Sequence, residues 1–169
     1  MKAFLLLAAL LALAGCGRAD TPATPKAANC TISEAGALRI ENAWVRTQKD
    51  VSATSAAYFT LCNAGTAPVT IEAITTPAAG IVELHESTRD ANGVVSMAPI
   101  GLLTLMPGEQ VTFEPGGKHA MLMNLAAPIA EGTTTVLALK LTGGGAVTTE
   151  AKAVPATRAA ARTHPARTQ

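Results

Sequence analysis

The sequence has few histidines and cysteines, and this scarcity limits the chemistry open to it. Only three of each occur in 169 residues. Three histidines without an evident nucleophile, base and orienting acid do not make a hydrolase or an oxidase, so we expect no enzymatic activity. No Cys-x-x-Cys motif is present, so thioredoxin-like or dithiol-transfer chemistry has no support.

The sequence also lacks an obvious membrane-spanning segment. The apolar run at residues 3–14 follows Lys2 and is too short for a stable spanning helix, which is typical of an export signal over residues 1–15. The four residues that end at Cys16, Leu-Ala-Gly-Cys, resemble the lipobox of bacterial lipoproteins, in which the cysteine is lipidated. We expect a periplasm-facing lipoprotein anchored to a bacterial membrane. An ordinary secretory signal is the alternative, and it also exports the chain.

Export bears on the remaining cysteines. If Cys16 carries lipid, Cys30 and Cys62 are left in an oxidising compartment. A disulfide between them is the simplest expectation, and two buried thiols are the alternative.

The chain divides into four parts. After the signal, residues 16–30 contain two prolines and no apolar periodicity, which predicts a lipid-anchored flexible linker. Residues 31–154 suffice for one domain, and residues 155–169 carry three arginines and no acid, which predicts a disordered basic tail. The domain has seven Lys or Arg against eleven Asp or Glu, so its acidic balance indicates no nucleic-acid surface. We expect a monomer.

The domain is predicted to be all-β, an antiparallel sandwich or barrel. Short alternating segments are separated by turn residues, and helical periodicity is almost absent. The expected strands are residues 38–45, 56–63, 69–75, 81–85, 94–97, 110–113, 119–125, 133–141 and 147–154. The expected core residues are Ile40, Trp44, Phe59, Leu61, Ile71, Leu84, Phe113, Leu122, Leu137 and Leu139.

Four side chains form a plausible complete shell for one metal ion: His85, Met97, His119 and Met121. Two thioethers are poor ligands for zinc, magnesium or calcium but good ligands for cuprous copper, with imidazole as an acceptable companion. His119 and Met121 are two apart on a predicted strand, so they share a face roughly 6 to 7 Å apart. The sequence therefore predicts a site for one Cu(I) ion.

One geometric difficulty concerns the first half of this set. A strict two-residue hairpin at Asn92-Gly93 would pair Met97 with Thr88 and place Met97 and His85 on opposite faces. If both bind one ion, the connection must contain a bulge, a longer loop or an unpaired arm.

With these residues in place, the chain resembles the periplasmic copper chaperone family PCuAC. The family motif is His, an adjacent Met, ten residues, Met, twenty-one residues, then His-x-Met, and this sequence matches every spacing. The resemblance covers residues 38–154 and includes Asn-Ala-Trp-Val-Arg at 42–46, Ala-Tyr-Phe at 57–59, Glu-Leu-His-Glu at 83–86 and Gly-Gly-Lys-His-Ala-Met-Leu-Met at 116–123.

The resemblance implies a cupredoxin-like β-sandwich that holds Cu(I) near its surface. It also implies delivery to the CuA site of cytochrome c oxidase, directly or through a thiol copper-transfer protein. The implied ligands are His85, Met97, His119 and Met121, and Met123 is a candidate accessory ligand. This sequence departs from the family motif at Glu86, because a methionine often follows the first histidine there. Glu86 is the second candidate accessory ligand. His164 is the only candidate in the tail for the Cu(II) site that some relatives have.

Three other functions remain open at this point. Copper storage or tolerance would use the same ligands with a different partner. A blue-copper electron carrier needs a cysteine thiolate near a histidine, and Cys62 has no histidine or methionine close to it in the sequence. The third possibility is a structural surface lipoprotein, in which the spacing of the two histidines and two methionines would be accidental.

Overall fold

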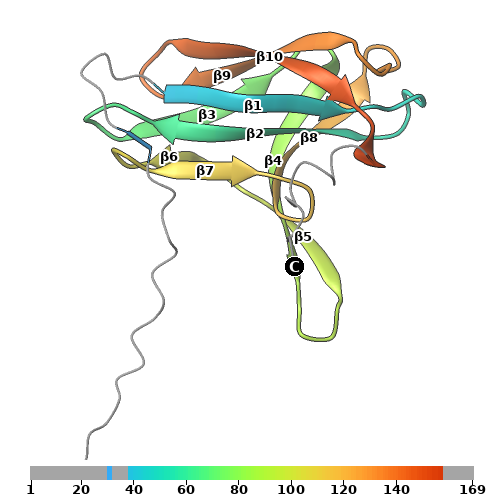
Figure 1. The fold of residues 1–169 in the computed structure, drawn as a ribbon, viewed down its shortest axis with the longest axis horizontal. Helices are drawn as coiled ribbons and strands as arrows, with labels where there is room; N and C mark the ends of the chain where they lie inside the picture. The colour runs from blue at the N-terminus through green and yellow to red at the C-terminus, as the bar shows by residue number, and fades with distance from the viewer. Residues whose placement is uncertain (1–29, 32–37, 158–169) are drawn as a thin grey trace, which may run out of the picture.

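The computed structural model describes residues 30–31 and 38–157, drawn in colour in Figure 1. The predicted signal peptide, the lipidation site Cys16, most of the linker, and the tail with His164 lie outside the described residues. No helix in the described part of the chain is long and apolar enough to cross a membrane.

The described part of the domain contains ten strands, which confirms the all-β prediction. Each of the nine expected strands overlaps an observed one, and the short β6 is additional, because three residues are too few to show a clear alternation. The strands are β1 (Leu38–Arg46), β2 (Ser55–Asn63), β3 (Val69–Thr75), β4 (Ala79–Arg89), β5 (Val95–Pro99), β6 (Leu103–Leu105), β7 (Gln110–Phe113), β8 (Lys118–Leu125), β9 (Thr134–Leu141) and β10 (Ala146–Val154).

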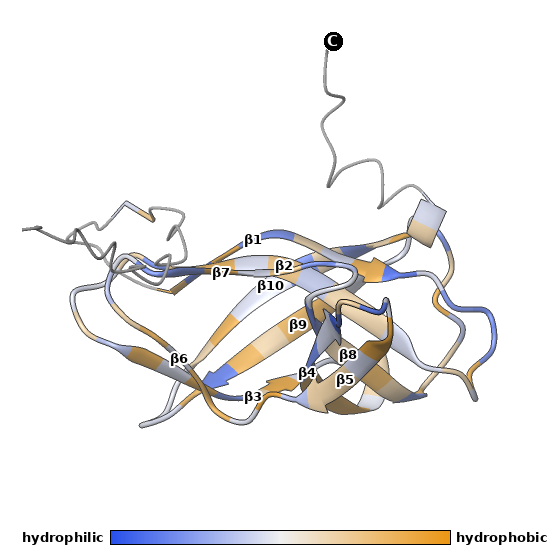
Figure 2. Ribbon diagram, turned by 90° about the horizontal axis from the view of Figure 1, so that it is seen from below, coloured by the Kyte–Doolittle hydropathy of each residue, from blue (hydrophilic) through white to orange (hydrophobic). Residues whose placement is uncertain are grey.

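The strands form one continuous sheet that folds over into an open sandwich. The strand order is β5-β4-β8-β2-β1-β10-β9-β3-β6, and β7 pairs with the second half of β2. The pairing of β1 with β10 is parallel, and the other strand pairs are antiparallel. Figure 1 shows that the far part of β4 and β5 projects from the sandwich as a hairpin. Figure 2 shows β1, β2 and β7 along one side of the molecule and β3 and β6 along the other.

The core lies between the two folded-over parts of the sheet. Leu61 of β2, Leu122 of β8 and Leu137 of β9 are completely buried in it. Of the predicted core, seven residues are buried, and Ile40 and Leu84 are partly buried against the same cluster. Alternation along each strand leaves the other set of side chains on the outer face.

Trp44 does not belong to this core, so its prediction is wrong. Asn42 has a φ of 55°, and the pairing of β1 with β2 shifts register between Glu41 and Trp44. This bulge turns Val45 inward and Trp44 outward, because one extra residue exchanges the two faces of a strand. On the outer face Trp44 stacks on Tyr58, with ring centroids 4.3 Å apart.

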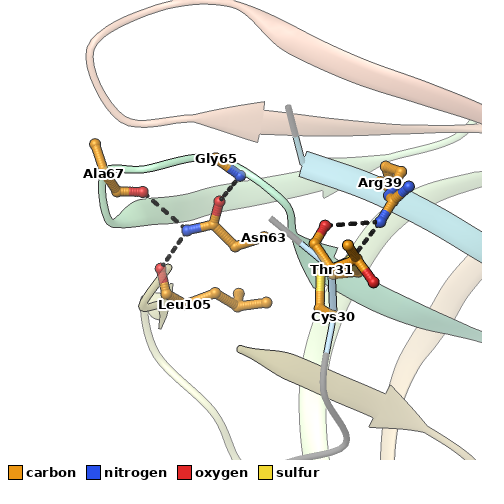
Figure 3. The surroundings of a disulfide bond; sticks show 8 residues. Cys30, Thr31, Arg39, Asn63, Gly65, Ala67 and Leu105 are labelled. Atoms are coloured by element: carbon orange, nitrogen blue, oxygen red, sulfur yellow. Dashed lines mark hydrogen bonds between the residues drawn. A yellow bond between two sulfur atoms is a disulfide. The ribbon is translucent and has the colours of Figure 1, made fainter. Parts of the chain in front are cut away.

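A disulfide joins Cys30 to Cys62 at the end of β2, with Cα atoms 5.6 Å apart (Figure 3). Arg39 of β1 donates a hydrogen bond of 3.3 Å to the carbonyl oxygen of Thr31, beside the disulfide. The buried Asn63 side chain donates to the carbonyl oxygens of Ala67 and Leu105. The disulfide therefore attaches the segment before β1 to a well-bonded corner of the sandwich.

Candidate metal site

The hairpin between β4 and β5 contains a longer loop, which is one of the three alternatives that the sequence leaves open. Met97 lies opposite Ser87, and the residues between Arg89 and Val95 form the connection. This pairing is offset by one residue from a strict hairpin at Asn92-Gly93. Because side chains alternate with a period of two, the offset moves Met97 onto the strand face that carries His85.

The pairing of β4 with β8 brings the second half of the set to the same face. His85 lies opposite His119, and Glu83 lies opposite Met121. The two imidazole rings meet edge to face, with centroids 6.0 Å apart. The structure therefore gathers His85, Met97, His119 and Met121 on one outer face, across three neighbouring strands.

A cavity of about 250 Å³ opens beside these residues. Its walls include Met97, His119 and Met121, together with Tyr58 and Arg46 from the neighbouring strands. His85 is not part of the cavity wall, but its ring neighbours His119, and its side chain is only 12% exposed. Three of the four predicted ligands thus line one cavity, with the fourth beside it.

His85 and His119 each have one ring nitrogen in contact with an oxygen that can only accept a hydrogen bond. His119 Nδ1 lies 3.1 Å from the carbonyl oxygen of Gly117, and His85 Nε2 lies 3.0 Å from a carboxylate oxygen of Glu83. In a neutral ring the proton sits on the nitrogen that donates, which leaves a lone pair on the other. The free nitrogens are therefore His119 Nε2 and His85 Nδ1.

The His85 Nδ1 atom is a buried polar atom with no hydrogen-bond partner in the described part of the chain. Buried polar atoms are nearly always paired, so an exception indicates a function or an absent ligand. An unprotonated imidazole nitrogen in this state is a competent metal ligand.

The two thioethers differ in exposure. Met97 lies on the edge strand β5 and is 53% exposed, whereas Met121 is half-buried in β8, between β2 and β4. One sulfur can thus be reached from solvent, and the other is held within the sheet.

The two candidate accessory ligands are placed differently. Met123 shares the face of Met121 and lies opposite Ile81, one strand repeat further along. Glu86 is on the other face of β4, where its carboxylate accepts a hydrogen bond of 2.6 Å from Lys118. The structure therefore does not place Glu86 with the four predicted ligands, because neighbouring residues of a strand point to opposite faces.

Sequence reasoning missed two residues beside the site, Glu83 and Tyr58. Glu83 could have been found, because it is two residues before His85 and so shares its face. Tyr58 reaches the cavity through the pairing of β2 with β8, which local sequence does not reveal. Among the described residues, no group of three or more His, Cys, Asp or Glu side chains could hold a metal ion, so the candidate site depends on methionine.

Comparison with protein families identifies a lipoprotein group. Residues 38–153 match the family described as "Putative lipoprotein LpqE-like". A relative from Leifsonia xyli subsp. xyli, "Putative lipoprotein Lxx21020", is 30% identical over 145 residues, which cover 85% of this chain and 83% of the relative. The chain therefore belongs to the LpqE-like family.

Comparison with solved structures identifies copper-binding domains. The copper-bound PCuAC domain from PmoF2 aligns with a TM-score of 0.57 at 19% identity, over 75% of this chain and 97% of that domain. This likeness shows that the two share a fold. The CuI-DR1885 structure from Deinococcus radiodurans aligns with a TM-score of 0.54 at 27% identity, covering 71% and 81% of the two chains. The apo form of the same protein is 28% identical over 82% of this chain and 96% of its own, again with a TM-score of 0.54. The predicted cupredoxin-like sandwich is confirmed.

Proposed function

We propose that this member of the LpqE-like family is a PCuAC-type copper chaperone that binds one Cu(I) ion through His85, Met97, His119 and Met121. The observation that carries the proposal is the face these four side chains share, which depends on the one-residue offset of β5. The likeness to the CuI-DR1885 structure from Deinococcus radiodurans supports the choice of metal.

The donor atoms suit cuprous copper. Two thioether sulfurs and two imidazole nitrogens are soft and borderline ligands, and none of them carries a charge that would favour a harder ion. A buried polar atom without a partner costs about 1 to 3 kcal/mol. A copper ion bound at His85 Nδ1 removes that cost and completes the site.

The exposure of Met97 provides a route for release. Thioethers need not lose a proton to bind and do not form disulfides, so they remain ligands in an oxidising compartment. An acceptor with thiolates displaces the exposed sulfur of Met97 first, while His119 and Met121 on the inner strand β8 still hold the ion. The acceptor we propose is the CuA site of cytochrome c oxidase, reached directly or through a thiol copper-transfer protein.

We also propose that the domain is exported and attached to a membrane through Cys16. The family and the relative from Leifsonia xyli are both described as lipoproteins, which supports this anchor. The prolines at 22 and 25 in the segment before Cys30 suit a spacer between the lipid and the domain. Such a tether would place the copper site near a membrane-bound acceptor.

A competition assay with a colorimetric Cu(I) chelator tests the ligand set. It uses the chain from residue 17 onward, which keeps every described residue, with alanine at either histidine or leucine at either methionine. Leucine conserves volume, so it removes the sulfur with little repacking. We expect one tightly bound Cu(I) and a loss of affinity of about tenfold or more per substitution, equivalent to about 1.4 kcal/mol.

Two other methionines provide matched controls. Met106 is 55% exposed and lies outside the cavity wall, and Met123 shares a strand and face with Met121. Neither methionine lines the cavity, so Met106→Leu and Met123→Leu should both leave Cu(I) affinity unchanged, and a loss in Met123→Leu would make Met123 an accessory ligand. Equal affinities for the wild type, Met97→Leu and Met121→Leu would refute the ligand set.

Two further measurements separate the competing functions. Transfer of copper from the loaded chain to an apo CuA domain supports delivery, whereas tight binding without transfer favours storage. A blue-copper carrier requires a thiolate, and both cysteines in the described residues are joined in the disulfide. The Cu(II) form should therefore show no intense visible charge-transfer band.

A further inference from the structure

We infer that Glu83 is a positioning residue for copper, because its carboxylate fixes the neutral His85 ring in the tautomer whose Nδ1 binds the ion. The inference rests on the proposed function and goes further, since it names the donor atom and the side chain that selects it. Glu83 and His85 are two apart on β4 and lie on the same face.

The first step is the contact between the two side chains. His85 Nε2 lies 3.0 Å from a carboxylate oxygen of Glu83. A carboxylate can only accept a hydrogen bond, so the ring must place its proton on Nε2. In the opposite tautomer the lone pair of Nε2 would face the negative oxygen, which is repulsive.

The second step is the environment of the other nitrogen. His85 Nδ1 is buried and has no hydrogen-bond partner among the described residues. A proton on Nδ1 would therefore be a buried donor without an acceptor, which is unfavourable. The surroundings of both ring nitrogens favour the same tautomer. In this tautomer Nε2 carries the proton, and the lone pair of Nδ1 is free to bind a metal ion.

The tautomer of the neighbouring His119 is set by a backbone oxygen, not by a carboxylate. His119 Nδ1 donates to the backbone oxygen of Gly117, which leaves Nε2 as its free nitrogen. The two rings thus offer opposite nitrogens to the site. A metal-bound histidine is usually oriented by an acceptor on its other nitrogen, and removing that acceptor lowers metal affinity. For His85 this acceptor is a side chain, so it can be removed by mutation.

Glu86 provides a matched control. It is also a carboxylate close to His85, but it lies on the opposite face of β4 and is paired with Lys118 at 2.6 Å. Removing it changes the charge near the site without touching the imidazole. Glu83 is 52% exposed, so its replacement by alanine should leave the fold intact.

The test combines Cu(I) affinity with ¹⁵N NMR of the imidazole nitrogens, on the same chain from residue 17 onward that is used in the competition assay. In the wild type we expect His85 Nε2 to be protonated, Nδ1 to be unprotonated, and added Cu(I) to shift the Nδ1 resonance. Glu83→Ala should give mixed tautomers and lower Cu(I) affinity by about 10- to 100-fold. Glu83→Gln, whose side-chain oxygen can still accept from Nε2, should restore the tautomer and most of the affinity. Glu86→Ala should match the wild type.

Two results would overturn the inference. One is a Cu(I)-dependent shift at His85 Nε2 instead of Nδ1, and the other is an unchanged tautomer and affinity in Glu83→Ala. His85→Ala distinguishes this failure from failure of the proposed ligand set. If His85→Ala weakens Cu(I) binding and Glu83→Ala does not, only the role of Glu83 is wrong. If His85→Ala has no effect, the ligand set itself is wrong, and the role of Glu83 is lost with it.

Discussion

His85 and His119 lie directly opposite each other on β4 and β8, with ring centroids 6.0 Å apart and ring planes at 68°. Opposed residues of an antiparallel pair have their Cβ atoms about 4.5 to 5.5 Å apart, so this relationship is set by the backbone ladder. Met97 reaches the same face through the β4–β5 hairpin. The spacing of the histidine pair is therefore set by the sheet, whereas the position of Met97 depends on the hairpin loop.

The first prediction concerns Asp90, which organises that loop. Its carboxylate accepts hydrogen bonds from the backbone N–H groups of Asn92 and Val94, at 2.9 and 2.8 Å. Each such hydrogen bond contributes about 0.5 to 1.5 kcal/mol to the stability of the folded conformation. Asp90→Ala should loosen the loop that sets the position of Met97, and lower Cu(I) affinity by about 3- to 10-fold in the chelator competition assay.

Asp50 serves as the control for this prediction. It makes the same kind of turn, accepting bonds from the hydroxyl and the backbone N–H of Ser52 at 2.7 and 2.9 Å, in the loop between β1 and β2. These bonds favour the charged carboxylate and hold the pKa of Asp50 below its ordinary value, chiefly through the Ser52 hydroxyl. Asp50→Ala should leave Cu(I) affinity unchanged. An equal loss in both variants would disprove the role of the hairpin loop.

The second prediction concerns the disulfide. Cys30 and Cys62 are 32 residues apart in the sequence, and closing a loop of this length contributes about 3 to 4 kcal/mol by restricting the unfolded chain. The double variant Cys30→Ser with Cys62→Ser should lose about this much free energy of unfolding in denaturant titrations. Cys62 lies four residues beyond Tyr58 on β2, roughly 13 Å from the nearest part of the cavity wall on that strand. Cu(I) affinity should therefore stay the same, and a parallel loss of affinity would argue against this placement.

The third prediction concerns the single tyrosine, Tyr58. Burial raises its pKa above the value of about 10 for tyrosine in water, and the positive charge of Arg46 partly offsets this. The contribution of neutral Tyr58 to the free energy of unfolding should be complete below about pH 10 and be lost as the pH rises through the raised pKa. Phenolate absorbance should show ionisation above pH 10, and Arg46→Ala should move the pKa still higher. Ionisation at or below pH 10 in the folded protein would contradict this.

The fourth prediction concerns the bulge in β1. Asn42 has a φ of 55°, in the left-handed region, which costs a β-branched residue about 1 to 2 kcal/mol. Asn42→Val should lower the free energy of unfolding by about this amount in denaturant titrations, whereas Asn42→Gly should not. Equal stabilities of the valine and glycine variants would show that the bulge does not constrain this residue.

Much of the fold could be predicted because the strands alternate clearly between apolar and polar residues. Leu137 and Leu139 are completely buried, as their spacing indicates. Trp44 was misplaced because a bulge depends on one backbone conformation at Asn42, and the apolar pattern does not encode it. The three-residue β6 was missed because it is stabilised by pairing with β3, a contact distant in the sequence.

The candidate site could be predicted in part for the same reason. Strand parity alone places His119 and Met121 on one face. The position of Met97 depends on the length of the loop between β4 and β5. The sequence indicates only that a strict two-residue hairpin would place Met97 and His85 on opposite faces. Strand parity also places Glu83 on the face of His85, two residues away. Tyr58 could not be assigned without the ladder, because its relation to the site is set by the pairing of β2 with β8.

X-ray absorption spectroscopy of the Cu(I)-loaded chain tests the central claim most directly, because it distinguishes sulfur from nitrogen ligands around the metal. Two sulfur and two nitrogen scatterers per copper ion are expected, with one sulfur lost in Met97→Leu and one nitrogen lost in His85→Ala. A copper ion surrounded by nitrogen and oxygen alone, or a sulfur shell that Met97→Leu and Met121→Leu both leave unchanged, would contradict the account.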